Sequence, residues 1–125
     1  MTDTNKKYIF VAEDDTFYLN IYQSKLEKEG YEVGIAKNGQ QTIEEMKKRK
    51  PDLLLLDLVM PAKDGFEVLK EMHDNPTLKG IKVIVVSNLG QEEDVKKAKD
   101  LGAIDYIVKA NMSITQIMEK IKSHI

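Results

Sequence analysis

The sequence predicts an α/β protein in which helices cover both faces of a parallel β-sheet. Short apolar runs of strand length alternate along the chain with longer stretches that have helical spacing. Strict alternation with short loops is typical of parallel sheets. Two of the runs, 53–56 and 81–86, are nearly all apolar, as expected for strands that are covered on both faces.

Five strands are expected from these runs. In chain order they are 8–12 (YIFVA), 32–36 (EVGIA), 53–56 (LLLL), 81–86 (IKVIVV) and 105–108 (DYIV). The runs are short and rich in β-branched residues, which favours strands over helices.

Five helices are expected between and after the strands. In chain order they cover residues 16–29, 39–50, 65–74, 91–101 and 113–124. Apolar positions repeat every three or four residues in these stretches, for example at Leu19, Tyr22 and Leu26 in the first. Glycine follows the first and fourth helices, and Pro51 follows the second, as is common at helix ends. Ser113 is expected to cap the last helix.

Length, charge and composition restrict the possible classes of protein. The chain has 125 residues, and we expect a single domain over residues 1–125 with no output domain. A net charge of −2 and a single arginine, Arg49, argue against direct nucleic-acid binding and against phosphate recognition by arginine forks. The absence of cysteine excludes disulfides and thiolate sites. No signal-peptide pattern and no membrane-length apolar run are present, so a cytoplasmic location without membrane insertion is expected.

Polar residues follow four of the five expected strands. They are Glu13, Asp14 and Asp15 after the first, Asp57 after the third, Ser87 and Asn88 after the fourth and Lys109 after the fifth. The carboxyl ends of parallel strands meet at one edge of a sheet, where ligands bind. Oxygen ligands without histidine or cysteine suit Mg²⁺ or Mn²⁺. A carboxylate beside such an ion can accept a phosphoryl group, whose charge a lysine and a hydroxyl can then bind.

Four motifs occupy these strand ends: VAEDD (11–15), LLLLDLVMPAKDG (53–65), VIVVSN (83–88) and GAIDYIVKA (102–110). Their key residues are separated by 43 residues from Asp14 to Asp57, 30 from Asp57 to Ser87 and 22 from Ser87 to Lys109. With these motifs and spacings the whole chain resembles the receiver domain of two-component response regulators, most closely the stand-alone, chemotaxis-regulator-like ones. The resemblance implies a flavodoxin-like (βα)5 three-layer sandwich with strand order 2-1-3-4-5.

The resemblance also implies roles for individual residues. Asp57 would accept the phosphoryl group, Ser87 would be the switch hydroxyl, Tyr106 the switch aromatic and Lys109 the phosphate-binding cation. Mg²⁺ or Mn²⁺ would be bound by Glu13, Asp14, Asp57 and the backbone carbonyl of Val59. Asp15 is expected to cap the first helix instead of binding metal.

A receiver of this kind would be a signalling protein and not a turnover enzyme. The phosphoryl donor would be a sensor histidine kinase or a phosphotransfer protein. An unknown output protein would bind the surface of the fourth helix, fifth strand and fifth helix when the phosphorylation state changes. The chain is expected to be a monomer or a weak, phosphorylation-dependent dimer.

Two alternatives remain at this stage. A pseudo-receiver would bind partners without becoming phosphorylated, but it is expected to have lost Asp57, Lys109 or a member of the acidic pair, Glu13 and Asp14. An aspartate-nucleophile phosphohydrolase needs a second carboxylate two residues after the nucleophile, and Val59 occupies that position.

Four positions depart from the usual pattern or bear on its details. Ala110 follows Lys109, where family members usually have a proline, often after a cis bond. Asn88 replaces a small residue beside the switch hydroxyl. The apolar Val59 and Leu89 stand where polar side chains can hold the hydrolytic water, which predicts a long-lived phosphoryl group.

His73 and His124 are both expected to face solvent, which argues against a histidine metal site.

Overall fold

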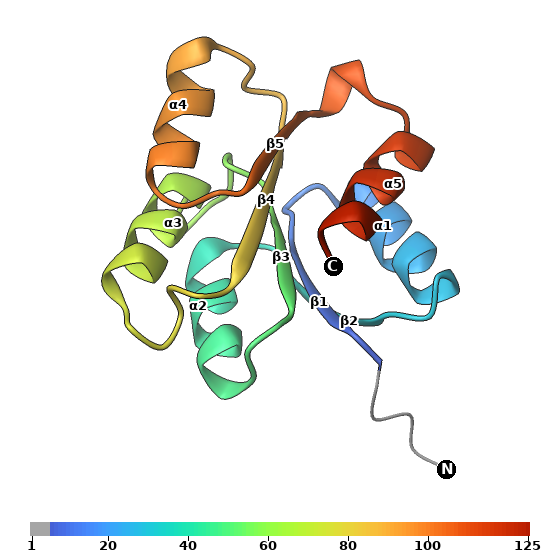
Figure 1. The fold of residues 1–125 in the computed structure, drawn as a ribbon, viewed down its shortest axis with the longest axis horizontal. Helices are drawn as coiled ribbons and strands as arrows, with labels where there is room; N and C mark the ends of the chain where they lie inside the picture. Colours follow the sequence, from blue (N-terminus) through green and yellow to red (C-terminus); the bar gives the residue numbers. More distant parts are fainter. Residues whose placement is uncertain (1–5) are drawn as a thin grey trace.

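The computed structural model describes residues 6–125, whose strands and helices alternate along the chain (Figure 1). The strands are β1 (Tyr8–Ala12), β2 (Glu32–Ala36), β3 (Leu53–Leu56), β4 (Lys82–Ser87) and β5 (Asp105–Val108). The helices are α1 (Thr16–Lys28), α2 (Gly39–Lys48), α3 (Gly65–Asp74), α4 (Glu92–Asp100) and α5 (Ile114–His124). Residues 1–5 lie outside the described residues. They belong to the domain expected over residues 1–125 and to the N-terminal segment that lacks a signal-peptide pattern.

All five strands are parallel and lie in the order β2-β1-β3-β4-β5. This is the order that the resemblance implied, so the predicted fold class is confirmed. Helices α1 and α5 cover one face of the sheet and α2, α3 and α4 cover the other, which gives three layers (Figure 1).

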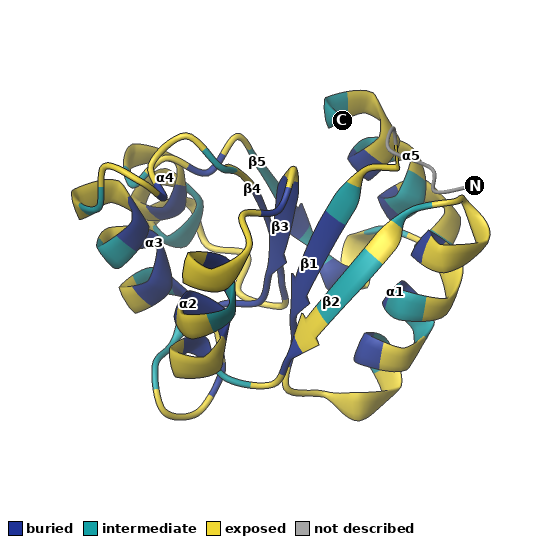
Figure 2. Ribbon diagram, turned by 90° about the horizontal axis from the view of Figure 1, so that it is seen from below, coloured by how far each residue is buried: buried dark blue, intermediate teal, exposed yellow. Residues whose placement is uncertain are grey.

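The central strand β3 forms the middle of the core. Its four leucines are all buried, and alternate ones belong to opposite faces: Leu54 and Leu56 pack toward α2–α4, while Leu53 and Leu55 pack toward α1 and α5. The strand is therefore apolar at every position because helices exclude water from both of its faces. Figure 2 shows β1 and β3 as buried and the edge strand β2 as more exposed.

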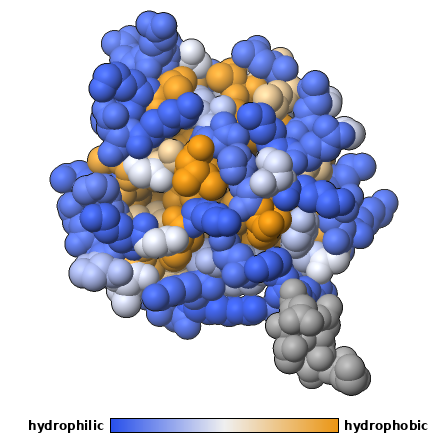
Figure 3. Space-filling model, viewed as in Figure 1, coloured by the Kyte–Doolittle hydropathy of each residue, from blue (hydrophilic) through white to orange (hydrophobic). Residues whose placement is uncertain are grey.

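Hydrophilic side chains cover most of the face seen in the space-filling view, and the apolar groups between them form small separate areas (Figure 3). Among the described residues, no helix has the length and apolar character needed to cross a membrane.

Local caps fix several helix starts. The Asp15 carboxylate accepts a hydrogen bond of 2.9 Å from the Phe17 N–H, which confirms its expected role at the start of α1. Ser113 caps α5, and its hydroxyl accepts from the N–H of Gln116 at 3.2 Å. Because Gln116 bonds back to the Ser113 N–H, the two residues form a capping box.

Some element ends differ from the prediction by one or two residues. Helix α2 ends at Lys48 instead of residue 50 because Arg49 leaves the helix and takes an extended conformation. Its guanidinium forms two hydrogen bonds with the Glu32 carboxylate on β2, at 2.8 and 2.6 Å. Strand β4 covers 82–87 and not 81–86, so Ser87 is the last residue of the strand.

The connection from β5 to α5 contains a 3-10 turn, Lys109–Asn111, that the sequence did not predict. Within residues 6–125 no peptide bond is cis, so Lys109 and Ala110 are joined by a trans bond. This agrees with the strong trans preference of a bond that precedes a residue other than proline.

The prediction that His124 faces solvent is wrong. Its Nε2 atom lies 2.9 Å from Oδ2 of Asp105, and the side chain is half-buried. Lys120 approaches the same carboxylate oxygen at 3.2 Å, so Asp105 on β5 holds the end of α5. The other histidine, His73, is exposed as expected.

Candidate functional site

The predicted site residues meet at the carboxyl edge of the sheet because parallel strands in register end together. Ala12 and Leu56 are register partners, so Asp57 follows β3 next to the end of β1. The Asp57 N–H donates to the Ala12 carbonyl at 2.9 Å. Ser87 pairs with Val108, which places Lys109 directly beyond the end of β5.

These strand ends surround a cleft of about 440 Å³. Its lining consists of Glu13, Asp14, Asp15, Tyr18, Asp57, Val59, Ser87, Asn88, Leu89 and Lys109. The structure thus brings together in this cleft every residue predicted for the site except Tyr106, whose hydroxyl bonds to the Leu89 carbonyl.

A glycine allows α3 to begin against the back of the site. The Gly65 N–H donates to the Leu58 carbonyl at 2.9 Å. A Cβ atom on Gly65 would overlap the Asp57 carbonyl oxygen and the backbone of Leu58. The close approach of α3 to the strand end therefore requires glycine here.

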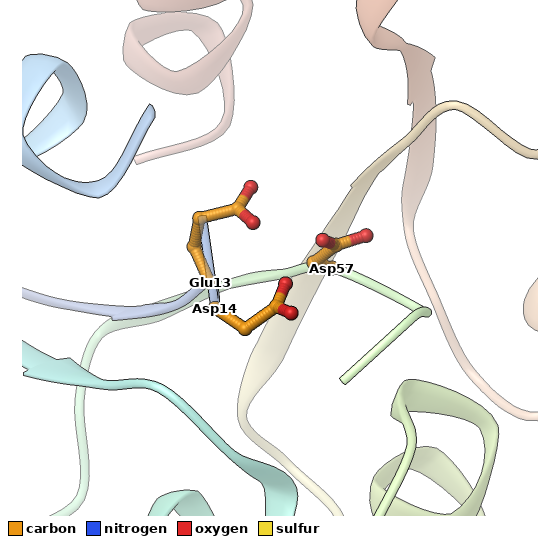
Figure 4. A group of neighbouring side chains, drawn as sticks. All are labelled: Glu13, Asp14 and Asp57. Atoms are coloured by element: carbon orange, nitrogen blue, oxygen red, sulfur yellow. The ribbon is translucent and has the colours of Figure 1, made fainter. Parts of the chain in front are cut away.

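Three carboxylates form the acidic part of the cleft. Each of Glu13, Asp14 and Asp57 offers an oxygen, and these oxygens all lie within 4.8 Å of one another. Figure 4 shows Glu13 and Asp14 at the end of the same strand, with the Asp14 carboxylate directed toward Asp57. Glu13 and Asp57 are buried, whereas Asp14 is exposed. Such a set of clustered oxygens is suited to a hard divalent cation.

Lys109 balances part of this negative charge. Its ammonium lies 2.5 Å from Oε1 of Glu13 and 3.3 Å from Oδ2 of Asp57, and only 5% of its side chain is exposed. Burial lowers the pKa of Lys109, but the ion pair with Glu13 and the charge of Asp57 outweigh burial and raise this pKa above its usual value. Lys109 is therefore expected to carry a positive charge inside the cleft at neutral pH.

Glu13 holds its proton more strongly than an ordinary glutamate. Burial and the neighbouring Asp57 carboxyl raise the pKa of Glu13 to about 7, although Lys109 opposes the rise. The cause is desolvation of a carboxylate next to a second carboxylate.

The backbone of Leu89 connects Ser87 to Tyr106. The Leu89 N–H donates to the buried Ser87 hydroxyl at 3.2 Å. The Leu89 carbonyl accepts a short hydrogen bond from the hydroxyl of the half-buried Tyr106. The backbone of Leu89 therefore bonds to both side chains, through its N–H and its carbonyl.

Apolar side chains stand at the mouth of the cleft. Val59 is 59% exposed and Leu89 is 37% exposed. The Val59 N–H approaches Oδ1 of Asp57 at 3.4 Å, so this residue lies directly beside the carboxylate.

Sequence reasoning missed Tyr18 as a residue of the cleft. It stands on α1 with its ring centroid 4.6 Å from the Lys109 ammonium. The sequence placed Tyr22 and Leu26 on the buried face of this helix, and Tyr18 is one turn before Tyr22. Its position on the buried face, in the first turn of the helix and close to the acidic residues, could have indicated that Tyr18 lines the cleft.

The fold and the cleft together define a class of protein: a flavodoxin-like domain with an acidic, lysine-containing site at the carboxyl edge of its sheet. Residues 9–122 match the family model of the response regulator receiver domain. The chain belongs to this family, and the resemblance inferred from the motifs is confirmed.

Known proteins similar to the chain support the same assignment. Response regulator RR06 of Streptococcus pneumoniae is 39% identical over 118 residues, which cover 92% of the chain and 51% of that protein, so the chain spans about half of its length. Sporulation initiation phosphotransferase F of Bacillus subtilis is 33% identical over 122 residues, with 97% of the chain and 94% of that protein covered.

Solved structures give the same result. A CheY-like response regulator receiver domain protein from Methanospirillum hungatei has a TM-score of 0.87 and 31% identity, with 95% of the chain and 93% of that structure covered. The Mn²⁺-bound form of response regulator Rcp1 has a TM-score of 0.81 and 28% identity, with coverage of 94% and 90%.

Proposed function

We propose that this receiver accepts a phosphoryl group on Asp57 from a histidine kinase or a phosphotransfer protein. Phosphorylation then changes its affinity for another protein. In this proposal the chain works in the cytoplasm as a signalling protein and not as a turnover enzyme. The observation that carries the proposal is the cleft in which Asp57 lies beside two further carboxylates and the Lys109 ammonium.

The residues of the cleft fit a divalent cation. All the available donors are oxygens, which suits Mg²⁺ or Mn²⁺, and the similar response regulator Rcp1 has an Mn²⁺-bound form. Glu13, Asp14, Asp57 and the backbone carbonyl of Val59 would hold the ion. The bound ion would neutralise part of the negative charge on the phosphoryl group.

The transfer itself requires a nucleophile and a cation from the chain. An Asp57 oxygen attacks the phosphorus of the phosphohistidine, and the phosphorus–nitrogen bond breaks as the new oxygen–phosphorus bond forms. The leaving imidazole nitrogen takes the electron pair of the broken bond. Lys109, 3.3 Å from Asp57, binds an oxygen of the transferred group.

The hydrogen bonds of Leu89 offer a route from the phosphoryl group to the surface. Ser87 turns its hydroxyl toward the phosphoryl oxygen and releases the Leu89 N–H. The loop then moves, its carbonyl releases Tyr106, and the α4-β5-α5 surface changes its affinity for an output protein. Helix α4 suits such a change because it is weakly attached to the rest of the domain. The small Ala98 is its buried residue, and the side chain of Gln91 forms no capping hydrogen bond at its start.

Two other functions are less well supported. A pseudo-receiver is disfavoured because Asp57, the acidic pair and Lys109 lie together in one cleft. A phosphohydrolase is disfavoured because the position two residues after Asp57 is Val59, which cannot serve as a general acid.

Intact-mass measurement after incubation with a small phosphodonor and Mg²⁺ tests the proposal. The parent protein is expected to gain one phosphoryl group and Asp57→Asn none. Asp100→Asn is the matched control because this exposed aspartate pairs with Lys96 on α4, away from the cleft; it should gain the group like the parent. No gain in the parent would favour the pseudo-receiver, and a gain in Asp57→Asn would assign the acceptor to another residue.

A further inference from the structure

The Lys109 ammonium has a third neighbour besides its two carboxylate partners. The ion pairs with Glu13 and Asp57 measure 2.5 and 3.3 Å, and the centroid of the Tyr18 ring lies 4.6 Å from the same nitrogen. A cation within about 6 Å of a ring centroid is attracted by the negative face of the ring. The contact is strengthened by the burial of the ammonium, since little water competes with the ring.

The Tyr18 ring is itself held in place by other aromatic residues of α1. Phe17 packs edge-on against it, with centroids 5.5 Å apart and an interplanar angle of 80°. Tyr22, one turn later, stacks on it at 5.9 Å and 29° and is buried. Of these two neighbours Tyr22 is the buried one, whereas Phe17 is 66% exposed, so it is the stacking on Tyr22 that favours one orientation of the Tyr18 ring.

We infer that Tyr18 is a positioning residue that keeps the Lys109 ammonium in the cleft while its anionic partners change. The inference rests on the proposed phosphorylation of Asp57. When Asp57 becomes phosphorylated, Lys109 must turn from the carboxylates to a phosphoryl oxygen. Its four-carbon stem is flexible, and the ring face attracts the ammonium without accepting a directed hydrogen bond. Tyr18 therefore restrains Lys109 to the cleft but leaves it free to rotate between Glu13 and the phosphoryl group.

The contact is tested first in the unphosphorylated protein by NMR. The ring current of Tyr18 should move the ε-methylene proton signals of Lys109 upfield from those of the exposed lysines. The signals are assigned by their loss in Lys109→Met. Tyr18→Leu should abolish the upfield shift, and Tyr18→Phe, which keeps the ring, should retain it. Lys109 signals at the ordinary lysine position in the parent, or unchanged signals in Tyr18→Leu, would overturn the inference.

The consequence for function is tested by the rate of phosphorylation with a small phosphodonor at saturating Mg²⁺. Tyr18→Leu removes the contact between the ring and the Lys109 ammonium. From the usual strength of such contacts, its phosphorylation rate should be about two- to thirtyfold lower than that of the parent. Tyr18→Phe should stay within about twofold of the parent, because the ring face and not the hydroxyl makes the contact. If Tyr18→Leu does not fold, Tyr18→Met supplies the same test with another ringless side chain.

Different results would refute the proposed function and the role of Tyr18. A parent protein that gains no phosphoryl group would refute the proposed function, whatever the NMR signals show. A parent that is phosphorylated at the same rate as a folded Tyr18→Leu would refute the role of Tyr18 and leave the proposed function intact.

Discussion

Lys109 is the residue that joins the parts of the cleft, because its ammonium contacts both Glu13 and Asp57. We predict that Lys109→Ala still folds and still binds Mg²⁺, since the three carboxylates remain. The variant should lose the Tyr106-linked change on phosphorylation, because the phosphoryl oxygen that Lys109 would bind then has no ammonium partner. NMR signals of Tyr106 before and after phosphorylation measure this. A normal response would mean that another lysine, such as Lys63, replaces it, although Lys63 pairs with Glu71.

The neighbouring aspartates Asp14 and Asp15 have different surroundings and should respond differently to substitution. Asp14 belongs to the acidic cluster, so Asp14→Asn should weaken Mg²⁺ binding by about tenfold or more, on the scale of ~1.4 kcal/mol per tenfold. Asp15 accepts the Phe17 N–H, and asparagine caps helices equally well. Asp15→Asn should therefore change Mg²⁺ affinity by less than about threefold. Titration of each variant with Mg²⁺ measures the difference, and equal losses would reject this division of roles.

Val59 and Leu89 should set the lifetime of the phosphoryl group. Both side chains line the cleft without a donor or acceptor, so they cannot position the hydrolytic water. The double variant Val59→Asn, Leu89→Glu is expected to accelerate the decay of phospho-Asp57 by about ten- to a hundredfold. The decay is followed by intact mass in Mg²⁺. Decay no faster than that of the parent would show that other groups control the lifetime.

At the scale of elements, the end of α5 is joined to β5 through one carboxylate. Burial raises the pKa of Asp105, but hydrogen bonds from His124, the Tyr106 N–H and Lys120 outweigh burial and lower this pKa below its usual value. The bonds to His124 and Lys120 are long-range contacts of the β5–α5 pair.

This lowered pKa has a defined effect on stability. The ionised Asp105 side chain increases the free energy of unfolding at pH values above the pKa of an unfolded aspartate, which is about 4. This contribution is lost as the pH falls through the lower pKa of the folded state. Asp105→Asn should reduce the free energy of unfolding by less than about 1 kcal/mol at pH 6, since the group is partly exposed. Urea unfolding at several pH values should show the two proteins converging below about pH 4. A difference that does not change with pH would contradict the ion-pair explanation.

Element positions could largely be predicted because they depend on local patterns. Helix α3 begins at Gly65 and ends at Asp74 as expected, since its apolar spacing is regular. The end of α2 could not be predicted because it depends on the pairing of Arg49 with Glu32, which are far apart in sequence. The 3-10 turn after β5 carries no distinctive sequence signal.

At the scale of the whole molecule, alternation of strands and helices predicted the layers, whereas the strand order required the family resemblance. Periodicity identifies which residues are buried, but it does not say which strand lies beside which. The same limit applies to the site. The strand-end positions of Asp57 and Lys109 predicted that they meet, but the contacts of Lys109 with Tyr18 and of His124 with Asp105 depend on how helices dock on the sheet.

The proposed function has one central consequence: of the three carboxylates that the sheet brings together, Asp57 should become the acyl phosphate. Borohydride reduction of the phosphorylated protein tests this most directly, because it converts an aspartyl phosphate to homoserine, which peptide mass spectrometry locates. We predict homoserine at position 57 after treatment with a phosphodonor and Mg²⁺, and unmodified Glu13 and Asp14. A reduced product at residue 13 or 14, or no reduced product in a protein that has gained phosphate, would contradict the account.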